Sequence, residues 1–239
     1  MIGVIGGNGV AATNKLCQLI EEKLTLEGAY RDAHHPEMLV WQATKAPSRS
    51  MYLEGRGPSW IEDYVEIGKK LKNCGCTKLC MCCNTAHYAI DILQEQIGIP
   101  FINLLDLVAE KCKNLGVKRV GMMCSDGLRK VGLYDRRFAV VAPGVELVYP
   151  DAEHQAMVTR GICNAKNTKR YLPLDNVESP ANLFGRVVES LQTRGVKVVV
   201  SGCTDIHSVF YPKDAMNLYV DSLDVLANKI VDLYLKKEM

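Results

Sequence analysis

The sequence predicts an α/β protein in which one structural unit occurs twice. Short apolar runs alternate with amphipathic stretches along the chain, the order typical of parallel strands and covering helices. Three separate segments also repeat at nearly one spacing. Residues 3–9 match 121–127 at an offset of 118, the residues from Cys83 onward match those from Cys203 onward at an offset of 120, and residues 101–111 match 219–229 at an offset of 118. This collinearity indicates an internal duplication; the alternative is coincidence between generic strand–turn–helix segments.

Apolar runs place the strands of the first copy at residues 3–5, 38–42, 77–82 and 100–103. Two helices between them each show one apolar face, formed in the first by Leu16, Leu19, Ile20 and Leu24, and in the second by Trp60, Tyr64, Ile67 and Leu71. Ser59 and Glu62 have the spacing of a capping box at the start of the second helix. A further helix is expected to begin just after Cys83.

The second copy repeats this order of elements. Strands are predicted at residues 119–124 and 196–201. Between them, a helix is expected to begin at Ser179 and to end at Gly195, because Pro follows the cap at one end and Gly stops the other. A last helix at residues 222–235 closes the chain.

Composition excludes several classes of protein. The 29 basic and 27 acidic side chains nearly balance, so no nucleic-acid or polybasic membrane partner is indicated. No apolar run approaches the ~18 residues that a membrane helix needs. The first ten residues lack the basic flank and cleavage site of a signal peptide, which predicts a cytoplasmic protein.

Ten cysteines are many for such a protein, and in a reducing compartment they are expected to stay free. Five of them cluster between residues 74 and 83, but their spacing does not match the paired knuckles of zinc sites, so no metal is expected. Most are predicted to pack as small apolar side chains in the core. This group consists of Cys17, Cys80, Cys82, Cys112, Cys124 and Cys163.

Cys83 and Cys203 stand apart from the other thiols. Each ends an apolar strand and is followed by short polar residues. The carboxyl ends of parallel strands line the ligand crevice of an open sheet, and a thiol at a helix amino terminus has a lowered pKa. If the duplicated units pack about a pseudo-twofold axis, the two thiols face each other across the central cleft. The alternative is two buried thiols that happen to end strands.

Four motifs resemble the aspartate/glutamate racemase superfamily, and most closely its aspartate-racemase-like branch, which typically shows GGMGPxAT, CNTAH and GCTE. They are GGNGVAAT near the start, PSRSMYL at 47–53, CNTAHYAID at 83–91 and GCTDI at 202–206. The resemblance implies two similar Rossmann-like lobes, each a mostly parallel sheet flanked by helices, related by a pseudo-twofold axis. We expect residues 1–99, completed by 213–239, to form lobe 1, and residues 100–212 to form lobe 2.

The resemblance also implies the chemistry. Members of this family racemise an amino acid without a cofactor, using one cysteine thiolate to remove the α-proton and a second cysteine to return one on the opposite face. Cys83 and Cys203 match these catalytic residues. An acidic amino acid is the expected substrate, aspartate before glutamate. A homodimer is compatible with the resemblance, because the family often forms dimers.

Substrate-binding residues are carried over from the same motifs. We expect the substrate's α-carboxylate or amine to be bound by Asn84, Thr85 and Thr204. Asn8 is expected to line the site through its backbone, and Gln42 to line the pocket. Arg49 matches the arginine that pairs with a side-chain carboxylate, for which its bidentate fork is suited. A lysine of the second lobe shares that role, and Lys166 is the candidate, with Lys169 close by.

Three residues next to the thiols are expected to support them: His87, His207 and Asp205. The two histidines either orient the thiols or cap helix turns. The sequence departs from the family pattern at three places, because Val10 follows Gly9 where Pro is usual, Ser48 replaces Asp, and Asp205 replaces Glu. These departures bear on the choice of substrate.

Rival interpretations remain. Residues 7–12 fit a G-x-G-x-x-A dinucleotide fingerprint, but the second strand ends in Gln42 rather than in the acidic residue that an NAD-dependent dehydrogenase needs. A decarboxylase or a maleate-type isomerase of the superfamily is disfavoured by the presence of both cysteines. A broad-specificity or hydantoin racemase keeps both, and Arg49 argues against it. A non-catalytic binding protein is disfavoured by the intact thiol motifs.

Overall fold

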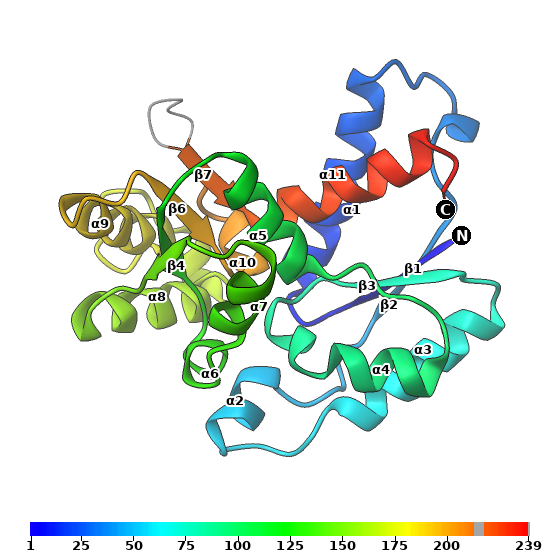
Figure 1. Ribbon diagram of the computed structural model, residues 1–239, viewed down its shortest axis with the longest axis horizontal. Helices are drawn as coiled ribbons and strands as arrows, with labels where there is room; N and C mark the ends of the chain where they lie inside the picture. Colours follow the sequence, from blue (N-terminus) through cyan, green and yellow to red (C-terminus); the bar gives the residue numbers. More distant parts are fainter. Residues whose placement is uncertain (213–217, 239) are drawn as a thin grey trace. The chain divides into compact units, whose positions relative to one another are not determined.

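The computed structural model describes residues 1–212 and 218–238 and divides into two compact units (Figure 1). Unit 1 consists of Met1–Leu104 and Leu223–Met239, and unit 2 consists of Leu105–Ser222. The boundaries expected from the sequence stay a prediction, and the second of them falls at residue 213, outside the described residues.

Unit 1 contains a parallel three-stranded sheet in the order β2-β1-β3. Its strands are β1 (Ile2–Gly6), β2 (Met38–Gln42) and β3 (Lys78–Met81). Its helical segments are α1 (Val10–Leu26), η1 (Asp32–His34), α2 (Arg49–Glu54), α3 (Ile61–Asn73), η2 (Thr85–Ala89) and α4 (Ile90–Ile97). The central strand β1 is buried throughout, which fits an apolar run between two neighbours.

Unit 2 contains a parallel four-stranded sheet in the order β5-β4-β6-β7. Its strands are β4 (Arg119–Met123), β5 (Glu146–Val148), β6 (Val198–Ser201) and β7 (Leu218–Asp221). Its helical segments are α6 (Asp126–Lys130), α7 (Leu133–Val141), α8 (Ala152–Asn164), η3 (Thr168–Tyr171), α9 (Pro180–Thr193) and α10 (Thr204–His207). Helices α8 and α9 pack against each other beside this sheet (Figure 1).

The two sheets have the same internal plan. In unit 1, Phe101 makes a parallel bridge to Leu79 on the outer side of β3. In unit 2, Tyr219 of β7 pairs with Val199 of β6. The sequence offsets of 120 and 118 relate these two pairs, so the duplication read from the sequence is matched by the strand order.

Two helices begin where the chain passes from one unit to the other. Helix α5 (Leu104–Asn114) starts at the end of the first segment of unit 1, and α11 (Ser222–Leu235) starts at the end of unit 2. The C-terminal segment is fastened onto unit 1 by three contacts. Lys23 Nζ lies 2.7 Å from Asp224 Oδ1, Tyr234 donates to the Ala33 carbonyl at 3.2 Å, and Lys78 donates to the Glu238 carbonyl at 3.2 Å.

The predicted apolar helix faces are confirmed, since all eight of the side chains named for the first two helices are buried. The capping box is wrong. Trp60 occupies the N-cap of α3, and Ser59 Oγ accepts from the Ile61 N–H at 3.2 Å, because burial of the indole sets the helix start one residue later.

Two other expectations need correction. Residues 100–103 form only the single bridge at Phe101, because α5 starts at Leu104 and leaves no room for a strand. The segment after Cys83 is the 3₁₀ helix η2, and a regular α-helix starts only at Ile90.

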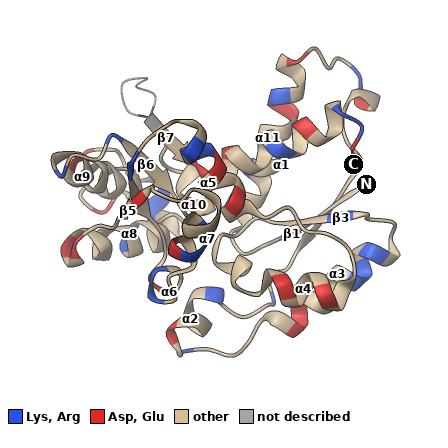
Figure 2. Ribbon diagram, viewed as in Figure 1, with Lys and Arg blue, Asp and Glu red and all other residues tan. Residues whose placement is uncertain are grey.

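Glycine is required at the turn that follows β1. Gly7 has φ of +78°, and a Cβ there would lie 2.5 Å from the backbone nitrogen of Ala43. The turn after β1 therefore passes close against the end of β2 at Gln42 and Ala43. No helix among the described residues combines the length and apolar character needed to cross a membrane. Figure 2 shows acidic and basic residues interspersed along the helices of both units.

Candidate active site

Cys83 follows the carboxyl end of β3 in unit 1 and is half-buried. It packs against the apolar cluster that contains Trp60, Tyr64 and Ala86. The next two side chains, Asn84 and Thr85, are both buried, so short polar groups surround the thiol as the sequence predicts.

His87 connects the turn after Cys83 to the start of α5. Its Nδ1 lies 2.9 Å from the Cys83 carbonyl oxygen, and the Leu104 backbone N–H donates to its Nε2 at 3.1 Å. Because Nε2 accepts, the ring proton is on Nδ1, and His87 is the neutral tautomer. Between the two roles left open by the sequence, this geometry favours holding the backbone over polarising the thiol.

Asn8 and Tyr64 form a buried polar pair close to Cys83. The side-chain amide of Asn8 donates to the Tyr64 hydroxyl through a short contact. Tyr64 is fully buried and Asn8 is 5% exposed, while Asn8 Oδ1 has no hydrogen-bond partner among the described residues. Burial raises the pKa of Tyr64 above its usual range, and the nearby charge of Arg49 opposes this rise.

Arg49 begins α2, and its guanidinium folds back over the preceding turn. Nη1 donates to the carbonyl oxygens of Ala46, at 3.3 Å, and Pro47, at 2.7 Å. Its Nε is buried and makes no hydrogen bond within the described chain. The guanidinium is therefore held in place through Nη1, and its Nε–H has no acceptor among the described residues.

Gln42 ends β2, as expected. Its Nε2 donates to Asn14 Oδ1 at 3.1 Å, and its Oε1 is buried without a partner among the described residues. It also lines an open groove of about 330 Å³ between the end of β2 and α3, together with Trp41, Lys70 and others. Cys83 and Arg49 do not line this groove.

Cys203 is the N-cap of α10 in unit 2, after the carboxyl end of β6. Its Sγ lies 3.9 Å from Asp205 Oδ2, and the same oxygen lies 2.8 Å from Lys166 Nζ. The carboxylate is almost fully buried, whereas the lysine side chain is about half exposed. The second thiol thus faces a carboxylate that an ammonium group neutralises.

His207 and Thr204 complete the surroundings of the second thiol. His207 Nδ1 lies 3.0 Å from Asp221 Oδ1, an approach of ring and carboxylate, and Nδ1 makes no hydrogen bond among the described residues. Thr204 is buried directly after Cys203. The helical segments after both thiols are short, so the dipole contribution expected from the sequence is smaller than that of a long helix.

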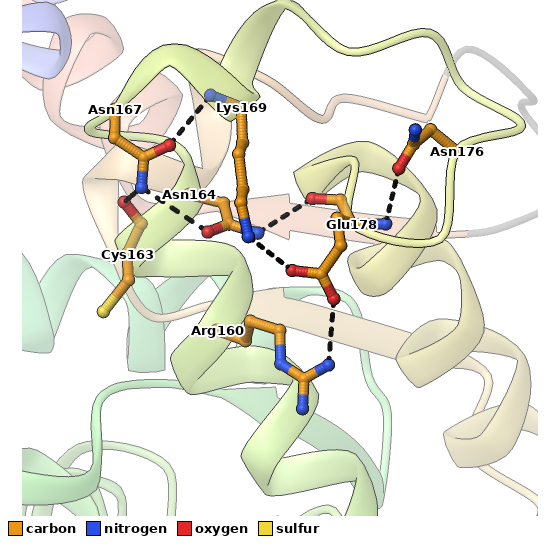
Figure 3. Close-up of polar contacts among 7 residues, drawn as sticks. All are labelled: Arg160, Cys163, Asn164, Asn167, Lys169, Asn176 and Glu178. Carbon is orange, nitrogen blue, oxygen red and sulfur yellow. Dashed lines mark hydrogen bonds and ion pairs between the residues drawn. The ribbon is translucent and has the colours of Figure 1, made fainter.

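The sequence offered two lysines for the second-lobe position, and their contacts in the structure differ. Lys169 Nζ lies 2.8 Å from Glu178 Oε2, and Arg160 Nη1 lies 3.1 Å from the other oxygen of that carboxylate (Figure 3). Asn164 also donates to the Glu178 carbonyl at 2.8 Å. Lys169 therefore pins the loop after α8, and Lys166 is the lysine beside Cys203.

The other cysteines fall into two groups. Burial raises the pKa of Cys80 and that of Cys112 to about 12, and Cys76, Cys82 and Cys124 are also buried. The expectation that Cys17 and Cys163 fill the core is wrong. Cys17 is half-buried because it lies beside the apolar face of α1, and Cys163 is exposed on the last turn of α8, as is Cys74 after α3. None of the ten cysteines forms a disulfide.

No group of three or more His, Cys, Asp or Glu side chains in the described ranges could hold a metal ion. The polar residues instead collect at two equivalent strand ends, each carrying a thiol. The fold and these sites define the class: an α/β protein of two like units with a thiol at the corresponding strand end of each.

Comparison with known proteins gives the family. Residues 2–230 match the model of the Asp/Glu/Hydantoin racemase family, and the chain belongs to this family of isomerases. A broad-specificity amino-acid racemase of Bacillus subtilis is 21% identical over 238 residues, covering 98% of each chain. The chain is thus an enzyme of the racemase type.

Solved structures share the fold. An aspartate racemase of Picrophilus torridus superposes with a TM-score of 0.80 at 23% identity, covering 98% of this chain and 93% of that one. An aspartate racemase homologue of Pyrococcus horikoshii superposes with a TM-score of 0.74 at 22% identity, covering 98% of each chain. At these identities the likeness shows the fold of two parallel sheets flanked by helices.

Two residues near the thiols were not predicted as site residues. Tyr64 reads in the sequence as one of four apolar positions on a helix face, and periodicity does not show where a phenol tip points. Asp221 was available to sequence reasoning, because it is the counterpart of Asn103 at the offset of 118 and is a carboxylate where the first copy has an amide.

Proposed function

We propose that this protein interconverts the enantiomers of an acidic amino acid, aspartate before glutamate, by proton transfer between substrate and two cysteines. The observation that carries the proposal is the pair of thiols, Cys83 and Cys203, each after the corresponding strand of its unit and each among buried short polar residues. Membership in the racemase family supports the reaction type.

In the proposed mechanism, one thiolate removes the α-proton, and the electron pair left on the α-carbon delocalises into the carboxylate. The other cysteine, as a thiol, returns a proton to the opposite face of that carbon. One S–H bond forms and one breaks, so the protons balance, and the roles exchange with the handedness of the substrate. The two thiols supply both proton transfers, so the proposal requires no cofactor.

The substrate's other groups have candidate partners in both units. Asn84, Thr85 and Thr204 lie next to the thiols and are proposed to bind the α-carboxylate or amine. Arg49 in unit 1 and Lys166 in unit 2 are the cations proposed to bind a second carboxylate of the substrate. Names of relatives agree in class, since they include an aspartate racemase and a broad-specificity racemase.

The deciding experiment is exchange of the α-hydrogen in heavy water. Each enantiomer of aspartate, glutamate and alanine is incubated with the protein, and deuterium incorporation and loss of optical purity are followed. Exchange accompanied by racemisation of aspartate is the expected result. Absence of exchange with every amino acid tested would overturn the proposal.

A broad-specificity racemase is the second candidate, favoured by the Bacillus subtilis relative and by Lys166 being paired with Asp205 rather than presented alone. A panel of neutral, basic and acidic amino acids separates the two. Comparable kcat/KM across the panel supports the second candidate, and a strong preference for aspartate supports the first. Location in the cytoplasm and assembly as a homodimer stay predictions.

A further inference from the structure

We propose that Tyr64 is a further specificity-determining residue, whose hydroxyl donates a hydrogen bond to the side-chain carboxylate of the substrate beside Arg49. The inference rests on the proposed function and extends it, because no motif points to Tyr64. It concerns unit 1 alone and depends on the Asn8–Tyr64 pair, the held guanidinium of Arg49 and the closeness of Tyr64 to both Arg49 and Cys83.

The first observation is the state of the Tyr64 hydroxyl. It accepts a hydrogen bond from the Asn8 amide, so its own proton is directed elsewhere. Tyr64 is fully buried, and it makes no other hydrogen bond to the described residues. Buried phenols usually have a partner for the hydroxyl, because an unsatisfied donor in the interior is costly.

The second observation is that two neighbours of Tyr64, Asn8 and Arg49, each carry a buried polar atom without a partner among the described residues. Asn8 Oδ1 and Arg49 Nε are both buried without hydrogen bonds among the described residues. Native interiors leave few such atoms, and each one calls for an explanation. A ligand that carries both acceptors and donors accounts for both of them together.

Packing brings these groups against one apolar cluster. The Arg49 guanidinium is bonded to the Ala46 carbonyl, and Ala46 packs against the same apolar cluster as Tyr64 and Cys83. The Trp60 ring meets the Tyr64 ring edge-on, with centroids 4.8 Å apart, and fixes the phenol in place. The hydroxyl is thus rigidly positioned close to the thiol.

The charges select the ligand group. The free proton of Tyr64 and the free Nε–H of Arg49 are both donors, and one of them carries positive charge, so they suit a carboxylate. Burial raises the pKa of Tyr64, which keeps the phenol protonated and able to donate at neutral pH. The unpaired acceptor, Asn8 Oδ1, suits the ammonium group of the same amino acid.

The test is the Tyr64→Phe variant, which keeps the ring and removes the hydroxyl. Binding of succinate, an unreactive dicarboxylate, and of propanoate, a monocarboxylate, is measured by calorimetry. We expect the Kd for succinate to rise about tenfold, the ratio typical of a lost hydrogen bond to a charged group, and the Kd for propanoate to change less than twofold.

Two further variants make the test specific. Tyr149→Phe removes a hydroxyl that bonds to Asp135 in unit 2 and should leave both affinities unchanged. Asn8→Asp supplies a carboxylate that captures the Tyr64 proton and should weaken succinate binding as Tyr64→Phe does. Equal weakening of both ligands in Tyr64→Phe, unchanged succinate binding, or no succinate binding by the wild-type protein would overturn the proposal.

The two proposals can fail separately. If the wild-type protein racemises aspartate but Tyr64→Phe retains its preference for succinate, the assignment of Tyr64 fails alone. If the wild-type protein exchanges no amino acid but its succinate preference depends on Tyr64, the carboxylate site stands and the proposed reaction fails. Unfolding temperatures without ligand show whether each variant keeps its fold.

Discussion

The surroundings of Cys83 and Cys203 differ in charge although the two strand ends have the same plan. Next to Cys83, a neutral imidazole bonds to the backbone on both sides. Next to Cys203, a buried carboxylate faces the thiol and is paired with an ammonium group. The histidine next to the first thiol is therefore neutral and bonded to the backbone, whereas the residue that faces the second thiol is a carboxylate in an ion pair.

The sequence repeat shows where this difference arises. At the offset of 120, Thr85 corresponds to Asp205, so a hydroxyl in the first copy becomes a carboxylate in the second. At the offset of 118, Asn103 corresponds to Asp221, which lies beside His207. The two sites thus differ by two replacements of a neutral residue with an acidic one, whereas the thiol and the histidine are the same in both. Duplicated sites can therefore keep a reactive group and differ in how it is supported.

The largest expected effect comes from removing either thiol. Cys83→Ser and Cys203→Ser should each lower kcat for racemisation by about 10³-fold, because a serine hydroxyl is a far weaker base than a thiolate. Cys80→Ser, in a buried thiol at the centre of β3, serves as the control. Polarimetry on L-aspartate measures all three, and an active Cys83→Ser or Cys203→Ser variant would break the pairing of the two sites.

A smaller effect is expected from Asp205→Asn, which sharpens the ionic half of the comparison. Loss of the carboxylate removes the acceptor beside Cys203 and should lower kcat about tenfold. It also releases Lys166, so the KM for aspartate should fall rather than rise. Steady-state kinetics separates the two constants. A KM that rises would show that Lys166 does not bind substrate.

The hydrogen bonds of His87, next to Cys83, are tested through the free energy of unfolding. His87→Phe leaves the Cys83 carbonyl and the Leu104 N–H without their partner, so the free energy of unfolding should fall by about 2–4 kcal/mol. His207→Phe should cost less, because His207 Nδ1 makes no hydrogen bond among the described residues. Urea unfolding followed by fluorescence measures both. Equal losses would remove the distinction drawn between the two histidines.

The smallest effect is expected from Lys169→Met. Lys169 and Lys166 each lie 2.8 Å from a carboxylate and are equally exposed, which makes them a matched pair. Removing the exposed Lys169–Glu178 pair should cost no more than about 1 kcal/mol of stability and leave kcat/KM for aspartate unchanged. Lys166→Met should raise the KM severalfold. Equal kinetic effects would contradict the choice of Lys166.

Much of the fold could be predicted because it depends on local patterns. The apolar faces of α1 and α3 and the run of β6 are visible as periodicity, and the repeat shows that two units share a plan. The start of α3 was missed because the capping box ignores the burial of Trp60. The strand at 100–103 was missed because the pattern does not show that α5 starts at Leu104.

The site could be predicted in part. The strand-end thiols follow from where the apolar runs stop, and the polar residues after them follow from the motifs. The choice between Lys166 and Lys169 depends on how the loop after α8 turns, which Glu178 decides. Tyr64 was hidden because its ring satisfies the apolar pattern while its hydroxyl, bonded to Asn8, is a long-range feature.

The return of the C-terminal segment to unit 1 has a consequence for synthesis. Unit 2 is one continuous stretch, Leu105–Ser222, whereas unit 1 lacks α11 until residues beyond Leu223 have left the ribosome. During translation, unit 2 can complete its contacts while Cys83 and its neighbours belong to a unit that is still open. Residues 1–104 are thus made before unit 2 but are completed after it, because unit 1 depends on α11 to close.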